Sequence, residues 1–224
     1  MKLYMHPVSN ASRPVRLFIA EKKLPVEEQI IDIMKGEHHG LAYSSINPSK
    51  LLPMLEDGDF RLTESSAILK YLASKFELPE YPTELRARAK VDESMDWFNT
   101  QFYRDFGYGL AYPQIFPTHK RPTDEINSHV VAWGQERAKG WFEVLDKHWL
   151  GPKSAYLMGD QITIADYFGG SLVTIGEVIR CDFSAYPNVA RWVGNLKKLS
   201  AWPKVNEAMY GFADYLKDQS FKAL

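Results

Sequence analysis

The sequence predicts two domains of different class, a small α/β domain followed by an all-α domain. The first 78 residues alternate between short strand patterns and helical patterns in the order β-α-β-β-α, whereas the rest of the chain carries almost only helical periodicity. Pro79 and Pro82 interrupt the pattern between the two parts. We therefore expect an α/β domain over 1–78, a linker over 79–86 and a helical domain over 87–224.

The α/β domain is predicted from five segments. A short strand at 2–5 precedes a helix over 9–24, which has several N-cap candidates at its start and an apolar stripe at helical spacing. A strand is expected within 26–34, a hairpin within 51–63 and a final helix over 65–76. Two parallel strands with a crossover helix, followed by an antiparallel hairpin, form a sheet with helices on its faces.

The helical domain is predicted from four long segments with helical periodicity, at 83–110, 123–150, 163–179 and 186–209. The only strand signal is a doubtful one in "AYLM" at 155–158. Thr163 and Asp166 have capping-box spacing, which makes Asp166 a folding residue rather than a catalytic carboxylate.

Composition is typical of a soluble globular protein, with 45% apolar and 25% charged residues. The formal charge of −1 argues against binding to nucleic acid or to an anionic membrane. No run reaches the roughly 18 apolar residues that a membrane span needs, and the N-terminus has no signal-peptide pattern. Cys181 is the single cysteine, so no disulfide can form within the chain. These observations favour a cytoplasmic protein.

Three stretches carry a family resemblance: "KLYMHPVSNASRPVRL" (2–17), "NPSKLLPMLEDGDFRLTESSAILKYL" (47–72) and "GDQITIADY" (159–167). Together they resemble the cytosolic glutathione transferases, most closely the serine-type theta and delta-like members and their bacterial relatives. The resemblance covers essentially the whole chain. It implies a thioredoxin-like N-terminal domain, an all-α C-terminal domain and a detoxifying enzyme that conjugates glutathione to a hydrophobic electrophile. It also implies a cytoplasmic homodimer with glutathione as co-substrate, no further cofactor and no metal.

Pro53 lies inside an apolar run, where a strand would lose a hydrogen-bond donor. By resemblance the Leu52–Pro53 bond is cis, and the Leu52 N–H and C=O bind the cysteinyl part of glutathione like one added strand. Glu64 and Ser65 stand where a strand ends and a helix begins, and a helix N-terminus favours a carboxylate. Ser65 is expected to donate to the γ-glutamyl carboxylate and Glu64 to accept from the ammonium, together with ordinary helix capping.

The glycyl end of glutathione is less clearly assigned. His38, in "KGEHHG", aligns with a histidine that reaches this end in theta-like enzymes, although an exposed loop histidine is the equal alternative and His39 is its less suitable neighbour. The chain departs from the family at Leu51, where relatives often carry lysine or glutamine. Lys50 is the adjacent residue that could contact the glycyl carboxylate instead, so this contact stays open.

A hydroxyl donor beside the thiol is the part that thiolate formation requires, because a free thiol has a pKa of about 8.5. Ser9 follows the first strand and precedes Arg13 by four residues, as the catalytic serine does in theta and delta-like enzymes, and is our first candidate. Asn10 and Ser12 are rival donors, and all three also suit plain capping of the helix. Arg13 is expected either to orient the site or to stabilise helix packing.

Aromatic side chains are concentrated in the first long segment of the helical domain. By resemblance this segment faces the glutathione domain, and its aromatics could line an electrophile pocket, although each alone is more typical of core. The candidates are Phe102, Tyr103, Phe106, Tyr108 and Tyr112. Thr100, Tyr103 and Arg104 are the polar positions best placed to contact glutathione.

The leading functional hypothesis is glutathione conjugation, with dehalogenation, peroxidase and isomerase activity as variants on the same site. A non-catalytic binding or assembly module of the same fold is the alternative, because a fold does not determine function. A redox thiol protein is a third hypothesis, which the absence of any cysteine near residues 9–13 weakens.

Overall fold

The N-terminal half of the chain is built on a four-stranded sheet. The computed structural model describes residues 1–224 and orders the strands β2-β1-β3-β4. Their bounds are β1 (Lys2–Met5), β2 (Glu27–Ile30), β3 (Met54–Asp57) and β4 (Phe60–Thr63). β1 and β2 run parallel, whereas β1–β3 and β3–β4 are antiparallel. This is the mixed sheet with a crossover and a hairpin that the sequence predicts.

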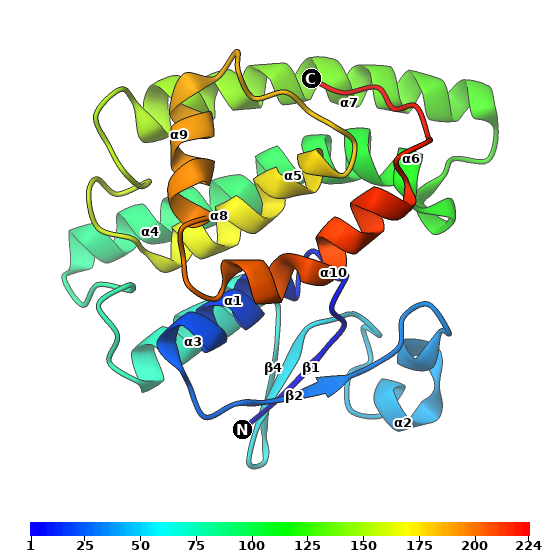
Figure 1. Cartoon of the computed structure of the whole chain (residues 1–224). Coiled ribbons are helices and arrows are strands. Elements are labelled where there is room, and N and C mark those ends of the chain that lie inside the picture. Colours follow the sequence, from blue (N-terminus) through cyan, green and yellow to red (C-terminus); the bar gives the residue numbers. More distant parts are fainter.

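Two helices separate this sheet from the helical half (Figure 1). α1 (Arg13–Lys22) and α3 (Ser65–Lys75) pack on each other, and both contact the core helix of the helical half. Val15, Phe18 and Ile19 form the buried stripe of α1 at i, i+3 and i+4. η1 (Glu37–His39) and the short α2 (Leu41–Ser44) lie in the long connection between β2 and β3.

Two predicted elements are shorter than the sequence pattern indicates. The helix expected over 9–24 begins only at Arg13, because Ser9 starts a turn whose carbonyl accepts the N–H groups of Ser12 and Arg13. The strand expected within 26–34 ends at Ile30. Asp32 then accepts the N–H groups of the next residues, such as that of Met34 at 3.0 Å, and turns the chain away from the sheet.

The connection between the halves runs from 76 to 84, between the end of α3 and the start of α4. Glu80 is buried within it, pairs with Lys22 of α1, and its carbonyl accepts the N–H of Ile164 at 2.9 Å. The connection is thereby attached to both halves. A domain boundary between 78 and 87 stays a prediction.

The helical half contains seven α-helices: α4 (Leu85–Trp97), α5 (Tyr103–Asp105), α6 (Tyr112–Ile115), α7 (Asp124–Val144), α8 (Ile164–Thr174), α9 (Pro187–Leu196) and α10 (Trp202–Tyr215). The π-helical segments η2 (Phe98–Phe102) and η3 (Phe106–Ala111) join α4, α5 and α6, and η5 (Leu145–Leu150) extends α7. Two 3₁₀ turns, η4 (Pro117–His119) and η6 (Ile175–Glu177), complete the half. None of its helices has the length and apolar character that crossing a bilayer requires.

α8 is the core helix, since every one of its residues is buried. The predicted capping box forms at its start, where the Asp166 carboxylate accepts the N–H and the hydroxyl of Thr163 at 2.8 and 2.9 Å. Asp166 also accepts the N–H of Leu157 at 2.8 Å and the indole N–H of Trp192 at 2.9 Å. The doubtful strand at 155–158 is reduced to a single bridge between Tyr156 and Gly159.

Candidate functional site

A cleft of about 420 Å³ lies where the two halves meet. The N-terminal half lines it with Ala11, Asn47, Ser49, Leu51, Leu52, Pro53, Thr63, Glu64 and Ser65. The helical half lines it with Asn99, Tyr103, Arg104, Tyr108, Phe168 and Leu172. The structure therefore brings eight of the predicted site residues into one cleft: Leu51, Leu52, Pro53, Glu64, Ser65, Tyr103, Arg104 and Tyr108.

The loop before β3 presents unpaired backbone groups to this cleft. The Leu52–Pro53 peptide bond is cis, as the sequence predicts. The Leu51 carbonyl accepts the Tyr43 hydroxyl at 2.6 Å and the Asn47 side-chain amide at 2.8 Å, which holds the loop in place. The N–H and C=O of Leu52 make no hydrogen bond within the chain. Such a free donor and acceptor on one residue suit a ligand that contains a peptide unit.

The N-terminus of α3 opens into the same cleft. Ser65 is 9% exposed and its hydroxyl makes no hydrogen bond within the chain, whereas Glu64 is exposed and adopts a positive φ of 64°. The first intrahelical bond runs from the Ile68 N–H to the Glu64 carbonyl, so the N–H groups of residues 65–67 have no partner. Unpaired N–H groups at a helix start attract a carboxylate.

The three candidate donors to the thiol, Ser9, Asn10 and Ser12, lie in the turn between β1 and α1 and differ in solvent exposure. Ser9 is partly exposed, and its hydroxyl oxygen accepts the Ser12 N–H at 3.3 Å. Ser12 is fully buried without a hydroxyl partner, and Asn10 is 5% exposed and donates to the Tyr103 hydroxyl at 3.4 Å. Ser9 itself does not line the cleft, although Ala11 of the same turn does.

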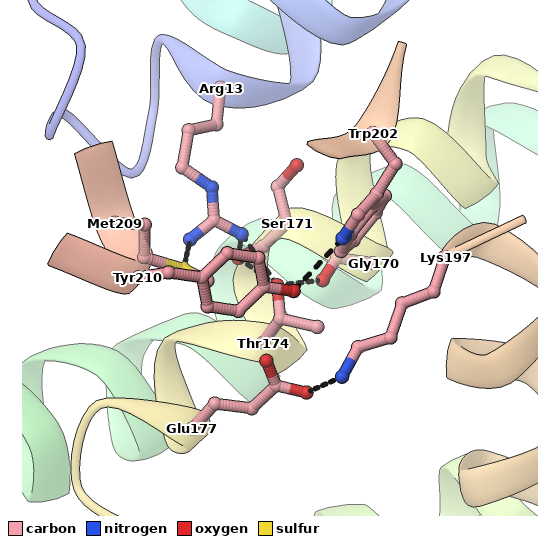
Figure 2. A network of polar contacts seen from close by, with 9 residues as sticks. All are labelled: Arg13, Gly170, Ser171, Thr174, Glu177, Lys197, Trp202, Met209 and Tyr210. Atoms are coloured by element: carbon pink, nitrogen blue, oxygen red, sulfur yellow. Dashed lines mark hydrogen bonds and ion pairs between the residues drawn. The ribbon is translucent and has the colours of Figure 1, made fainter. Parts of the chain in front are cut away.

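Arg13 does not line the cleft, and its side chain reaches Ser171 and Thr174 of α8 and Met209 of α10 (Figure 2). Its guanidinium donates to the Ser171 carbonyl at 3.1 Å, to the Thr174 hydroxyl and to the Met209 sulfur. Burial lowers the pKa of Arg13 to about 10, which leaves it a cation at neutral pH. The sequence left two roles open for Arg13, orienting the site or stabilising helix packing. Its direct side-chain contacts are those of helix packing.

His38 and Lys50 lie outside the residues that line the cleft. His38 is partly buried in η1 and contacts the His39 ring in a tilted arrangement, with the ring centroids 3.8 Å apart, and burial lowers its pKa. Lys50 is exposed, with a positive φ of 56°. Its neighbours Ser49 and Leu51 line the cleft, and the Leu51 side chain is 64% exposed.

The predicted electrophile aromatics divide between cleft and core. Tyr103 and Tyr108 line the cleft, whereas Phe102 and Phe106 are completely buried and pack on Phe142 of α7, with centroids 5.1 and 5.0 Å apart. The wider π-helical turns set this division, because they place residues five apart on one face. The two phenylalanines therefore belong to the core and not to the pocket.

Tyr112 is 6% exposed and stands behind Tyr103, with the two hydroxyls hydrogen-bonded to each other. Thr100 does not line the cleft and donates to the Asp96 carbonyl of its own helix at 2.8 Å. Arg104 does line it, held by two bonds to Asp105 at 2.8 and 3.0 Å.

Seven cleft residues were not predicted from the sequence: Ala11, Asn47, Ser49, Thr63, Asn99, Phe168 and Leu172. Asn99 shares the five-residue spacing of the π-helical face with Arg104, a signal that is visible only once the helix type is known. Phe168 and Leu172 lie four residues apart in an apolar core helix, and nothing in the sequence distinguishes them from its other buried residues.

Comparison with known proteins agrees with this geometry. The family model for the N-terminal domain of glutathione S-transferases matches residues 1–74, and the model for the C-terminal domain matches residues 114–199. Human glutathione S-transferase theta-1 is 34% identical over 200 residues, covering 86% of this chain and 80% of the relative. Human theta-2 is 33% identical over 204 residues, covering 88% of this chain and 80% of the relative.

Solved structures of theta-class glutathione transferases are also similar to this chain. Human theta-2, in complex with glutathione and an unknown ligand, superposes with a TM-score of 0.85 at 27% identity over 99% of this chain and 92% of that one. Human theta-class transferase in complex with the glutathione conjugate of 1-menaphthyl sulfate has a TM-score of 0.81 at 29% identity, over 96% and 90% of the two chains.

A four-stranded thioredoxin-like domain joined to a helical domain, with a cleft where they meet, defines the architectural class of the glutathione-dependent transferases. The chain belongs to the glutathione S-transferase family of enzymes, with theta-class members among its relatives.

Proposed function

We propose that the chain conjugates the thiolate of glutathione to small hydrophobic electrophiles in the cleft between its two halves. The observation that carries this proposal is the unpaired N–H and C=O of Leu52 in the same cleft as the unpaired N–H groups at the start of α3. They match a ligand that has both a peptide unit and a free carboxylate, which glutathione has. Dehalogenation, peroxide reduction and isomerisation are variants that the same thiolate could perform.

Glutathione is placed by the residues that line or flank this cleft. The Leu52 backbone holds the cysteinyl unit, Ser65 and the α3 N-terminus hold the γ-glutamyl carboxylate, and Glu64 accepts from the ammonium. The glycyl end then extends toward Lys50 and His38, beyond the exposed Leu51 side chain.

Ser9 is the proposed donor to the thiolate. Because its oxygen accepts the Ser12 N–H, its own proton remains free for a ligand. A decrease of about two units in the thiol pKa corresponds to about 2.7 kcal/mol, which one charge-assisted hydrogen bond and the N-terminus of α1 can supply. The buried positions of Asn10 and Ser12 favour Ser9 over these rivals.

The test compares wild type with Ser9→Ala and with Ser12→Ala as the matched control. Calorimetry measures glutathione binding, ultraviolet absorbance measures thiolate, and turnover is followed with a chloro-nitroaromatic and an alkyl halide. Ser9→Ala is expected to bind glutathione within a few-fold of wild type, and to lose the thiolate signal and about 100-fold in turnover at neutral pH. Ser12→Ala is expected to keep the thiolate signal and the turnover of wild type.

Each failure has a distinct meaning. A wild-type chain that does not bind glutathione would contradict the transferase proposal and favour an assembly module of the same fold. Full activity in Ser9→Ala would move the thiolate role to Asn10 or Ser12.

The homodimer and the cytoplasmic location that the family resemblance implies belong to the same proposal. Light scattering on the purified chain measures the first, and a mass of one chain at micromolar concentration would argue against it. Cell fractionation of the native protein measures the second.

A further inference from the structure

Arg13 is a buried cation without a carboxylate partner. Its side chain is 1% exposed, and its three hydrogen-bond acceptors are the Ser171 carbonyl, the Thr174 hydroxyl and the Met209 thioether, none of which is an anion (Figure 2). Its Nε has no partner at all. Burying a guanidinium is costly unless an opposite charge compensates it. The protein therefore keeps a positive charge here without supplying the negative one.

The charged groups around Arg13 do not neutralise it. The acidic residue whose charge reaches Arg13 is Glu177 of η6, and its carboxylate is paired with the Lys197 amine at 2.6 Å. Three phenols also lie near the guanidinium, those of Tyr103, Tyr112 and Tyr210, and burial raises the pKa of the first two. With Glu177 paired to Lys197, the Arg13 charge has no free anion beside it.

Arg13 is directly connected to the turn that carries Ser9. Its backbone N–H donates to the Ser9 carbonyl at 3.1 Å, while its side chain reaches α8 and α10. Tyr103, which lines the cleft, and Tyr112 behind it both interact with the Arg13 charge. The backbone of Arg13 is thus bonded to the Ser9 turn, and its charge is buried against α8 and α10.

We propose that Arg13 is a positioning residue whose buried positive charge lowers the pKa of the glutathione thiol, with the bound thiolate as its missing counter-charge. This inference rests on the proposed function, since it needs the thiol to bind beside Ser9. When the thiol ionises, its proton leaves to solvent and the sulfur becomes negative. A nearby positive charge that is not exposed to water favours that form. Ser9 acts by contact, whereas Arg13 acts through its field and by holding the turn.

The main test compares Arg13→Met with Arg13→Lys in the full chain. The pKa of bound glutathione is read from ultraviolet thiolate absorbance against pH, and from the pH profile of kcat/KM. Arg13→Met is expected to raise the thiol pKa by about one unit with little change in the KM for glutathione. Arg13→Lys keeps the charge and is expected to restore most of the difference. A merely structural role would not follow the charge in this way.

Arg16→Met is the matched control. Arg16 is the next arginine of α1, and its guanidinium is already paired with the Glu28 carboxylate at 3.0 and 3.2 Å. Its removal is expected to leave the thiol pKa unchanged within about 0.3 units. An equal increase in the Arg16 and Arg13 variants would overturn the specific role of Arg13.

A second pair of variants tests the field without changing the buried arginine. Lys197→Gln leaves the Glu177 carboxylate free to offset the Arg13 charge, so the thiol pKa is expected to rise. Glu177→Gln removes the acid whose charge reaches Arg13, so the thiol pKa is expected to fall. Shifts of equal sign in both variants, or no shift in either, would overturn the inference even if Arg13→Met fails to fold.

Glutathione binding and the role of Arg13 are tested separately. If wild type does not bind glutathione, the proposed function is lost. If wild type binds and ionises glutathione, and a folded Arg13→Met has the same thiol pKa, only the role of Arg13 is lost.

Discussion

The two walls of the cleft offer a ligand different kinds of chemistry. The wall from the N-terminal half presents main-chain groups, namely the Leu52 N–H and C=O and the free N–H groups at the start of α3. The wall from the helical half presents side chains such as Tyr103, Arg104 and Tyr108, carried on a helix with π-helical turns.

The two kinds of wall suit two kinds of ligand, one whose structure is always the same and one whose structure varies. Backbone groups keep their geometry whichever side chains surround them, which suits a ligand whose structure does not change, such as glutathione. Side chains on one helix face can be exchanged without altering the fold, which suits recognition of diverse electrophiles. Substitutions in one wall and not the other test this difference.

The largest expected effect concerns α8, the helix on which both walls depend. Asp166→Ala leaves the Thr163 and Leu157 N–H groups and the Trp192 indole N–H buried without an acceptor. The free energy of unfolding is expected to fall by about 3–5 kcal/mol, measured by urea denaturation. Asp166→Asn is the control and should lose less, because its amide oxygen can still accept. A loss below about 1 kcal/mol would contradict the packing role.

Next in size is Ser65→Ala, a change to the main-chain wall. Loss of one hydrogen bond to a carboxylate is expected to weaken glutathione binding about 10- to 100-fold, with no change in preference among electrophiles. Isothermal titration measures the affinity. Ser66→Ala is the control, since Ser66 follows in α3 but does not line the cleft. Equal losses in both variants would show that the helix start, and not the Ser65 hydroxyl, had been damaged.

The smallest expected effect comes from Tyr108→Leu in the side-chain wall. The Tyr108 ring is 47% exposed and packs edge-on against Tyr103 with the centroids 5.1 Å apart. Its loss is expected to lower kcat/KM about 3- to 10-fold for aromatic electrophiles relative to alkyl halides, with glutathione affinity unchanged. Phe102→Leu, a core change, is expected to lower stability and leave this ratio as it is. A changed ratio in that control would place Phe102 in substrate selection.

The predictions from local sequence patterns succeeded for the main-chain wall. Pro53 in its apolar run, the hairpin turn and the strand-to-helix junction at Glu64 and Ser65 are all encoded within a few residues of each other, so the sequence suffices to place them together. The capping box of Thr163 and Asp166 succeeded for the same reason. Of the three predicted N-cap candidates for α1, the structure uses Ser12, so the helix begins at Arg13 and the Ser9 turn precedes it.

The sequence did not show which aromatic side chains of the long helix point into the cleft and which point into the core. The aromatics of the long helix follow an ordinary helical spacing in the sequence, but its π-helical turns send Phe102 and Phe106 to the core and leave Tyr103 and Tyr108 in the cleft. Arg13 is a similar case, since the sequence places it beside Ser9 while the packing of α8 and α10 decides where its charge is buried.

The sequence was therefore enough to predict the two-domain fold, the family resemblance and the local backbone features of the main-chain wall, because strand pattern, turn chemistry and helix capping are local properties of the chain. Long-range packing determines which side chains of the helical half line the cleft, and it leaves Arg13 without an anion of its own. Facing direction and charge compensation depend on contacts between residues far apart in the chain, such as the 158 positions between Arg13 and Ser171. No pattern of neighbouring residues can encode them.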